Sequence, residues 1–400
     1  MPAIPALTVV GIGVDGWDGL SPAAAAELTG ADVVIGSARQ IALVAGRVAE
    51  TEVWPSPMTE ALPGLRHRFA GRRAVVLASG DPMFYGVGAT LIRLFGAEAV
   101  RIVPHPSSVS LACARLGWAQ PEVDVISVVG RPLSLVQPWI APGRRLLILV
   151  SEADKAARIA ELLRDRGVGD SAVTVLERLG GPAERISTAT DWAGRTHDPL
   201  AIVAVECATG GRPLSRTPGL PDDAFDSDGA LTKQDVRAVT LAALAPLPGQ
   251  LLWDIGAGSG SIAVEWMRTH AACRAAAVES RADRRERIVR NAETLGVPGL
   301  CVVAGRAPEA LRDLPEPDAV FIGGGLTTPG VVEACLAALR PGGRLVANGV
   351  TIETESALAD LHARFGGRLT RITISHAAPM GTFTSFRPAL PVTQWTHLRS

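Results

Sequence analysis

A glycine-rich turn in the second half of the chain has the residue types that let a protein backbone touch a small ligand. The apolar run Leu251–Trp253 is followed by the stretch Asp254–Gly260, which reads DIGAGSG, and a helical pattern begins at Ser261. We expect a strand that enters a helix through a turn that only glycine can form without a steric clash. The free N–H groups of the first helical turn would then face the ligand.

An acidic residue stands at the end of the next predicted strand. Glu279 closes the run Ala275–Glu279, where its carboxylate is placed to accept hydrogen bonds from both hydroxyls of a ribose. The third predicted strand ends at Gly305, and an adenine ring could lie against the backbone near Ala307. These features together predict a ligand that contains a nucleoside.

The spacing of the glycines distinguishes two such ligands. A dinucleotide site usually shows GxGxxG, with the pyrophosphate on the helix N-terminus. The pattern here is DxGxGxG, which resembles that of class I methyltransferases that bind S-adenosylmethionine (SAM). The candidate contacts to SAM in this half are Thr232, Asp254, Gly256, Ala257, Gly258, Ser259, Gly260, Glu279 and Ala307.

Three further loops stand at predicted strand ends in the first half. They read GIGVDG from Gly11, SGDPMFYG from Ser79 and PSSVS from Pro106, and the last opens a helix. Glycine and Asp-Pro leave the backbone exposed at such turns. A purely structural set of turns stays an alternative. The candidate binding residues are Gly11, Gly13, Gly80, Asp81, Ser107 and Ser108.

Short apolar runs alternate with alanine-rich helical stretches throughout, and this order predicts an α/β fold with largely parallel sheets. In the first half we expect strands at Leu7–Val10, Asp32–Ile35, Ala74–Ala78, Arg101–Val103, Asp124–Val128, Leu146–Val150, Val173–Leu176 and Ile202–Val205. In the second half we expect strands at Leu251–Ile255, Ala275–Glu279, Cys301–Ala304, Ala319–Ile322 and Arg344–Ala347, and then a final hairpin of Arg368–Ser375 with Thr382–Arg387.

A stretch rich in Gly, Pro, Ser and Asp separates the two halves. Its composition predicts a linker over residues 209–229, between an N-terminal domain of residues 1–208 and a C-terminal domain of residues 230–400.

Composition excludes several classes of protein. The chain is 47% hydrophobic and 20% charged, so it can bury a large core, and its net charge of -1 argues against an extended nucleic-acid surface. The five cysteines form no CxxC pair, so neither a disulfide framework nor a zinc site is expected. An apolar run of membrane-spanning length and a basic leader are both missing from the sequence, which favours a cytoplasmic protein.

The motifs of both halves resemble those of known families. Residues 1 to about 208 are similar to the tetrapyrrole (corrin/porphyrin) methylases through GIGVDG, SGDPMFYG and PSSVS. Residues from about 228 onward resemble the methyltransferase-decarboxylases of cobalamin synthesis through LTK from Leu231, DIGAGSG, GRAPEAL and FIGGG from Phe321. The resemblance implies two α/β subdomains in the first domain and a Rossmann-like second domain.

The resemblance also implies an activity. Each domain would bind one SAM and methylate a precorrin, the first at C5 and the second at C15, and the second would also remove the carboxyl group of the C12 acetate. The overall change would be precorrin-6B to precorrin-8X, without a metal because the conjugated ring can take up the electrons of the leaving group. Both modules have oligomeric relatives, so a homo-oligomer is expected.

Such a substrate is a polycarboxylate, which needs N–H or cationic partners. The backbone of Gly323, Gly324 and Gly325 is the expected substrate contact, and further candidates on that side are Asn348, Glu353, His376 and Arg387.

Two alternatives stay open. One is a methyltransferase that acts on RNA or protein. The other is a SAM-binding scaffold with a degenerate first domain, because many relatives have a histidine where Val129 precedes Gly130-Arg131.

Overall fold

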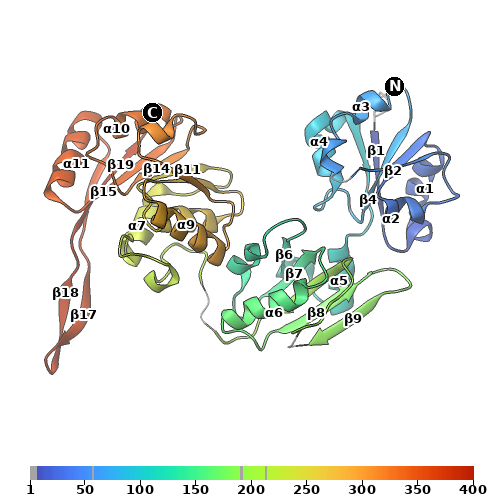
Figure 1. Ribbon diagram of the computed structural model, residues 1–400, viewed down its shortest axis with the longest axis horizontal. Coiled ribbons are helices and arrows are strands. Elements are labelled where there is room, and N and C mark those ends of the chain that lie inside the picture. The colour runs from blue at the N-terminus through green and yellow to red at the C-terminus, as the bar shows by residue number, and fades with distance from the viewer. Residues whose placement is uncertain (1–6, 56–57, 190–191, 212–213) are drawn as a thin grey trace. The chain divides into compact units, whose positions relative to one another are not determined.

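The computed structural model describes residues 7–55, 58–189, 192–211 and 214–400, and its contacts divide the chain into two compact units (Figure 1). The first unit consists of residues 1–131 and 141–212, and the second of residues 132–140 and 213–400. Neither unit contains, in its described part, a helix that is both long and apolar enough to cross a membrane.

The first sheet of the first unit has five parallel strands in the order β3-β2-β4-β1-β5. Their bounds are β1 Leu7–Ile12, β2 Val33–Gly36, β3 Thr51–Val53, β4 Ala74–Ser79 and β5 Val100–Val103, and the helices of this part are α1 Pro22–Thr29, α2 Ala38–Leu43, α3 Leu65–Arg68 and α4 Val87–Phe95. Val9, Val34 and Val76 are fully buried because both faces of the sheet are covered. The sequence pattern missed β3, a three-residue edge strand with exposed side chains.

The second sheet of the first unit differs from the largely parallel prediction. Its order is β6-β7-β10-β8-β9, and only the β6–β7 pair is parallel. Strand β10, the last of these five in the chain, lies between β7 and β8, and local sequence does not predict this placement. The bounds are β6 Val123–Ser127, β7 Arg145–Val150, β8 Ala172–Glu177, β9 Arg185–Ala189 and β10 Ala201–Glu206, with helices α5 Ser108–Leu116 and α6 Lys155–Asp165. The edge strand β9 was also missed, because its sequence RISTA has no buried side chain.

The second unit contains a doubly wound sheet of seven strands in the order β13-β12-β11-β14-β15-β19-β16. The first five are parallel, as predicted, and β19 is antiparallel to both of its neighbours. The bounds are β11 Leu251–Ile255, β12 Arg274–Glu279, β13 Cys301–Ala304, β14 Ala319–Ile322, β15 Arg344–Gly349, β16 Arg368–Ile372 and β19 Val392–Leu398. The helices are α7 Gln234–Leu244, α8 Ser261–Thr269, α9 Ala282–Thr294, α10 Val331–Ala338 and α11 Ile352–Phe365.

The predicted final hairpin was wrong in its pairing. Strand β16 pairs with β19, which the polar sequence VTQWTHL concealed, whereas β17 Ser375–Met380 and β18 Phe383–Pro388 pair only with each other (Figure 1). Trp395 and Gln394 of β19 are buried, and the Gln394 amide donates hydrogen bonds to Thr240 and Asn348. These bonds explain how a polar strand can lie inside the sheet.

Most of the predicted linker is folded onto the second unit. Leu220 and Phe225 are buried in the same cluster as Leu241 and Trp266. The backbone N–H groups of Gly219 and Leu220 donate to the buried carboxylate of Glu265, at 2.6 and 3.0 Å. Residues 214–229 are therefore part of this unit's structure, which composition alone did not reveal.

Candidate functional site

The loop Asp254–Gly260 joins β11 to α8 with three glycines in the left-handed region. Their φ angles are 68°, 60° and 75° at Gly256, Gly258 and Gly260. A Cβ atom on Gly256 would lie 2.8 Å from the backbone of Gly324, and one on Gly258 would lie 2.7 Å from the carbonyl oxygen of Ala230. Only glycine fits at these two positions, because the loop packs closely against the backbone of two other segments; both glycines also line a cavity.

Two carboxyl groups flank this loop. Asp254 is buried, and its carboxylate accepts a hydrogen bond from the Ala263 amide at 3.1 Å, which fixes the start of α8. Burial raises the pKa of the Asp254 carboxyl to about 7; the Ala263 amide opposes this shift and the nearby Glu279 adds to it. Glu279 accepts hydrogen bonds from the amides of Gly258 at 3.0 Å and Arg281 at 2.9 Å. A carboxylate has about four acceptor positions, so Glu279 keeps capacity for ribose hydroxyls.

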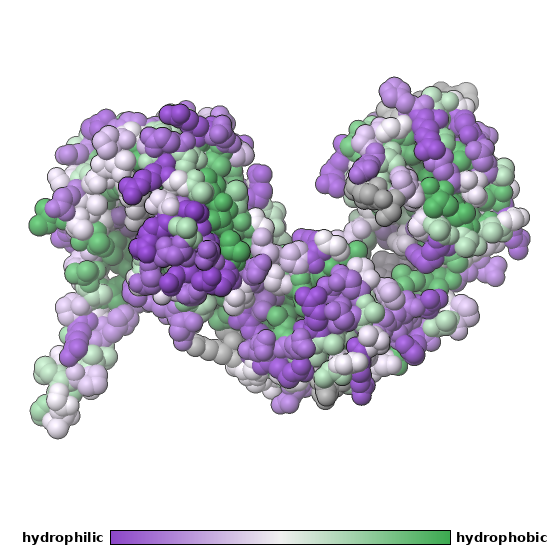
Figure 2. Space-filling view, in the orientation of Figure 1, coloured by the Kyte–Doolittle hydropathy of each residue, from purple (hydrophilic) through white to green (hydrophobic). Residues whose placement is uncertain are grey.

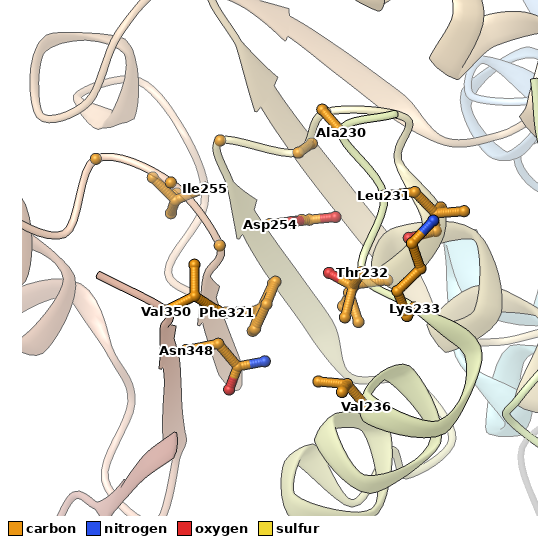
Figure 3. A pocket seen from close by; sticks show the side chains of 18 of the residues that line it. Ala230, Leu231, Thr232, Lys233, Val236, Asp254, Ile255, Phe321, Asn348 and Val350 are labelled. Atoms are coloured by element: carbon orange, nitrogen blue, oxygen red, sulfur yellow. The ribbon is translucent and has the colours of Figure 1, made fainter. Parts of the chain in front are cut away.

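A cavity of about 1110 Å³ opens beside these groups. It exceeds the roughly 300–1,000 Å³ typical of a pocket for one small molecule, so it has room for a cofactor and part of a second ligand. Figure 3 shows Thr232, Asp254 and Asn348 around this space. The predicted residues that line it are Thr232, Asp254, Gly256, Ala257, Gly258, Glu279, Ala307, Gly323, Gly324, Gly325, Asn348 and His376.

Four predicted residues lie outside the lining. Ser259 and Gly260 are the last two residues of the loop and are buried, and a Cβ atom on Gly260 would clash with Ile288. Glu353 is an exposed residue in the first turn of α11, whose backbone lowers the pKa of its carboxyl. Arg387 lies on β18 directly opposite His376 of β17, but it is not among the residues that line the cavity.

Asn348 and His376 lie in different settings on the cavity wall. The Asn348 amide donates to the Thr240 hydroxyl at 2.9 Å and accepts from Gln394 at 3.0 Å, so its orientation is fixed. His376 is exposed, and its Nε2 atom lies 3.2 Å from the carboxylate of Asp235.

Sequence reasoning missed the group that holds Thr232 in place. Arg237 is fully buried, and its guanidinium donates to the carbonyl oxygens of Thr232 and Leu220 and to the carboxylate of Glu265 at 2.6 Å. It also reaches Asp222 at 3.2 Å. The signal was present as one arginine on the apolar side of the helical pattern QDVRAVTLAAL. These hydrogen bonds fix Leu220, Asp222 and Thr232 in place, and Asp222 and Thr232 line the cavity.

In the first unit, the three predicted loops meet at the ends of the neighbouring strands β1, β4 and β5. A Cβ atom on Gly11 would lie 2.3 Å from the carbonyl oxygen of Gly80, and one on Gly80 would lie 3.4 Å from the Cα atom of Ser107. Ser107 caps α5 by accepting from the Ser110 amide at 3.1 Å, and Ser108 is the first residue of that helix. The Asp81 side chain accepts from the Met83 amide at 2.8 Å, which shapes its own turn.

A histidine that the sequence analysis did not single out lies between these loops. The ring of His105 lies close to Gly13, at 2.7 Å from an added Cβ atom. Its Nε2 atom is 3.7 Å from the Asp15 carboxylate, and its Nδ1 atom is 3.1 Å from the carbonyl oxygen of Pro106. Across the described residues of both units, no cluster of three or more His, Cys, Asp or Glu side chains could hold a metal ion.

Comparison with known proteins agrees with this division into two units. The family described as Tetrapyrrole (Corrin/Porphyrin) Methylases matches residues 6–191, and the family described as Precorrin methyltransferase domain matches residues 223–399. The chain is 49% identical over 403 residues to the precorrin-6Y C(5,15)-methyltransferase (decarboxylating) of a Sinorhizobium species, an alignment that covers 99% of this chain and 97% of the relative.

Shorter relatives match less than half of the chain. A cobalt-precorrin-7 C(5)-methyltransferase from Salmonella typhimurium is 34% identical over 45% of this chain and 88% of its own length. A probable cobalt-precorrin-6B C(15)-methyltransferase (decarboxylating) from Pyrobaculum calidifontis is 34% identical over 44% of this chain and 93% of its own length. The crystal structure of the C-terminal domain of precorrin-6Y C5,15-methyltransferase from Rhodobacter capsulatus is 49% identical, with a TM-score of 0.44 over 46% of this chain and 100% of that structure.

Proposed function

The chain belongs to the family of decarboxylating precorrin-6Y C5,15-methyltransferases of cobalamin biosynthesis, and we propose that its two units divide the two methylations between them. The first unit acts at C5, and the second acts at C15 and removes the carboxyl group of the C12 acetate. Relatives that each match less than half of this chain and are named for a single position support this division.

The observation that carries the proposal for the second unit is that Gly256, Gly258 and Glu279 line one large cavity, with the Gly258 amide donating to the Glu279 carboxylate. When bound, SAM supplies an electrophilic methyl group. The Glu279 carboxylate would accept hydrogen bonds from the ribose hydroxyls, and the backbone near Ala307 would hold the adenine; both residues line the cavity. These contacts would hold the cofactor in one orientation, and such positioning can lower the activation free energy by up to about 7–11 kcal/mol.

The remaining part of the cavity holds the precorrin ring. The N–H groups of Gly323 and Gly324 donate to the Ile255 carbonyl oxygen, at 3.0 and 3.2 Å, so the donors for its carboxylates are the Gly325 N–H group and the fixed amide of Asn348. His376, whose Nε2 atom lies 3.2 Å from the Asp235 carboxylate, lines the same cavity and takes up the proton that a ring carbon loses on methylation. For decarboxylation, the carbon–carbon bond to the carboxyl group breaks, the electron pair enters the conjugated ring, and a proton replaces CO₂.

In the first unit, the meeting loops of β1, β4 and β5 form the second SAM site, with Gly11, Gly13, Gly80 and Ser107 at its centre. The two sites together give the chain two cofactors, one for each unit. Incubating the full chain with precorrin-6B and SAM tests the proposed function. Mass spectrometry should show a product with two added methyl groups and one carboxyl group fewer, and a product with one methyl group would contradict the assignment of one methylation to each unit.

We also propose that the protein forms a homo-oligomer through the β17–β18 hairpin. Met380, Phe383 and Phe386 on this hairpin are 58%, 74% and 74% exposed, and Figure 2 shows green patches along it. A two-stranded hairpin is marginally stable alone, and exposed apolar groups of this size mark interaction surfaces. A second copy of the chain is the partner that is always present at equal concentration.

Sedimentation velocity of the full chain tests the hairpin's role. The double variant Phe383→Ser/Phe386→Ser should sediment as a smaller species than the wild type. Ile352→Ser is the matched control, because Ile352 is 84% exposed in the same unit but lies on α11. Equal sedimentation of the wild type and the double variant would rule out the hairpin as the interface.

A further inference from the structure

The first unit contains a cavity of about 600 Å³ that the predicted SAM residues do not line. Its walls are mostly apolar and include Val14, Leu43 and Leu200, while two arginines, Arg39 and Arg178, supply positive charge. Val14 belongs to the glycine loop after β1. The cavity therefore adjoins the loops proposed to hold SAM.

Arg39 has a fixed position and lacks an acidic partner. Its guanidinium donates to the Ser79 hydroxyl at 2.7 Å, and the neighbouring Gln40 donates to the same hydroxyl at 3.1 Å. Ser79 directly precedes Gly80, which ties Arg39 to the second predicted loop. Of the carboxylates in the described residues, none lies within ion-pair distance of Arg39.

Arg178 is held by an unusual backbone. Its φ angle of 50° places it in the left-handed region, which a residue with a long side chain seldom adopts unless its surroundings enforce it. The Arg178 amide donates to the Leu200 carbonyl at 3.0 Å, and its guanidinium binds Asp198 at 2.6 Å. Asp198 thus orients Arg178 and neutralises one of the two cations.

The two guanidinium groups repel each other. Burial and the positive charge of Arg178 both lower the pKa of Arg39. Asp198 also lines the cavity and offsets the charge of Arg178, so Arg39 is the cation that lacks an acidic partner, and an anionic group of a ligand would complete the arrangement. Arginine suits a carboxylate because its planar fork can donate two parallel hydrogen bonds.

We propose that Arg39 and Arg178 bind a peripheral carboxylate of the precorrin ring in the first unit, with the ring's apolar surface against Val14, Leu43 and Leu200. This inference rests on the proposed function and specifies how its first site recognises the substrate. Because Ser79 and Val14 link the cavity to both glycine loops, a ring held there would lie next to the SAM methyl group. Arg39 is then a substrate-binding residue that selects for the acidic rim of the ring.

The variant Arg39→Gln tests this assignment in the full chain. Gln removes the charge but can still donate to Ser79. The KM for precorrin in C5 methylation should rise about tenfold to hundredfold, as expected for a lost charge-assisted hydrogen bond, while kcat changes much less. Arg39→Lys should recover part of this loss. Arg93→Gln is the matched control, because exposed Arg93 donates only within its own helix.

Three further readouts separate the possible outcomes. SAM affinity of the first unit and C15 methylation by the second should stay at wild-type values. A fall in SAM affinity would mean that Arg39 holds the methionine carboxylate, and an unchanged KM would mean that it holds no substrate; each result overturns the proposal. If the wild type failed to methylate C5, the proposed function would be wrong. Absorbance titration of precorrin against the wild type and Arg39→Gln would then still decide whether Arg39 binds the ring.

Discussion

Replacing Glu279 by glutamine should lower the affinity of the second unit for SAM about tenfold to hundredfold. Glutamine keeps the shape of the side chain, but it removes the charge and one acceptor from the ribose hydroxyls. A charge-assisted hydrogen bond contributes about 1.5–3 kcal/mol, and each 1.4 kcal/mol is about a factor of ten in affinity. The Gly258 amide, which donates to Glu279 at 3.0 Å, would also lose its charged acceptor.

Calorimetry on the full chain measures this effect directly. The wild type should bind two SAM molecules, and the Glu279→Gln variant should show one site of unchanged affinity and one much weaker site. C5 methylation should persist while C15 methylation is lost at limiting SAM. Decarboxylation shows whether that step needs only the bound ring, in which case it persists, or follows C15 methylation, in which case it is lost too.

The exposed residue Glu286 on the neighbouring helix α9 gives the control variant, Glu286→Gln, which should leave both affinities unchanged. A Glu279→Gln variant that bound two SAM molecules as tightly as the wild type would remove Glu279 from the site. That result would also weaken the assignment of the glycine loop to SAM.

Replacing Arg237 by methionine should destabilise the second unit by about 3–5 kcal/mol, because it leaves the buried carboxylate of Glu265 without its cationic partner. For a unit of this size, each kcal/mol lowers the melting temperature by roughly 2–4 °C. The carbonyl oxygens of Thr232 and Leu220 lose their donor at the same time, so SAM affinity should fall in the fraction that stays folded.

Scanning calorimetry of the full chain checks this expectation and the proposed domain division together. We propose that the two units unfold independently, with residues 214–229 in the second one, so only one of two transitions should move in Arg237→Met. Arg364→Met is the control, since Arg364 is 59% exposed and lies 4.0 Å from Glu333, and such surface pairs contribute about 0–1 kcal/mol. A common shift of both transitions would show that the two parts unfold as one.

Most of the predicted residues of the second unit line its cavity, because the glycine turn and the strand ends are recognisable in local sequence. The apolar strand β11, the three glycines and Glu279 at the end of β12 follow each other in one βαβ unit, so sequence spacing fixed their places relative to one another. Only the family resemblance pointed to Leu231, Thr232 and Lys233, because their own sequence does not show that Arg237 holds Thr232 beside the cavity.

What could not be predicted depends on partners that are distant in sequence. Residues 214–229 have the composition of a linker, but Arg237 and Glu265 satisfy their backbone groups and Leu220 and Phe225 bury their apolar surface. Strand β19 was missed because Thr393 and Gln394 appear polar in the sequence, whereas the folded sheet supplies Thr240 and Asn348 as partners for Gln394. In each case the required partner lies on another element.

Because residues 214–232 fold onto the second unit, they restrict where the chain can be cut to give two separate polypeptides. A second polypeptide that started at residue 230 would keep the glycine loop but lose Leu220 and Phe225 from its core, and Glu265 would lose the amides of Gly219 and Leu220. One that started before Leu214 would keep these groups, together with the Leu214 and Ser215 carbonyls that accept from Arg268. A cut that keeps these contacts of the second unit therefore lies upstream of Leu214, before the stretch whose composition is that of a linker.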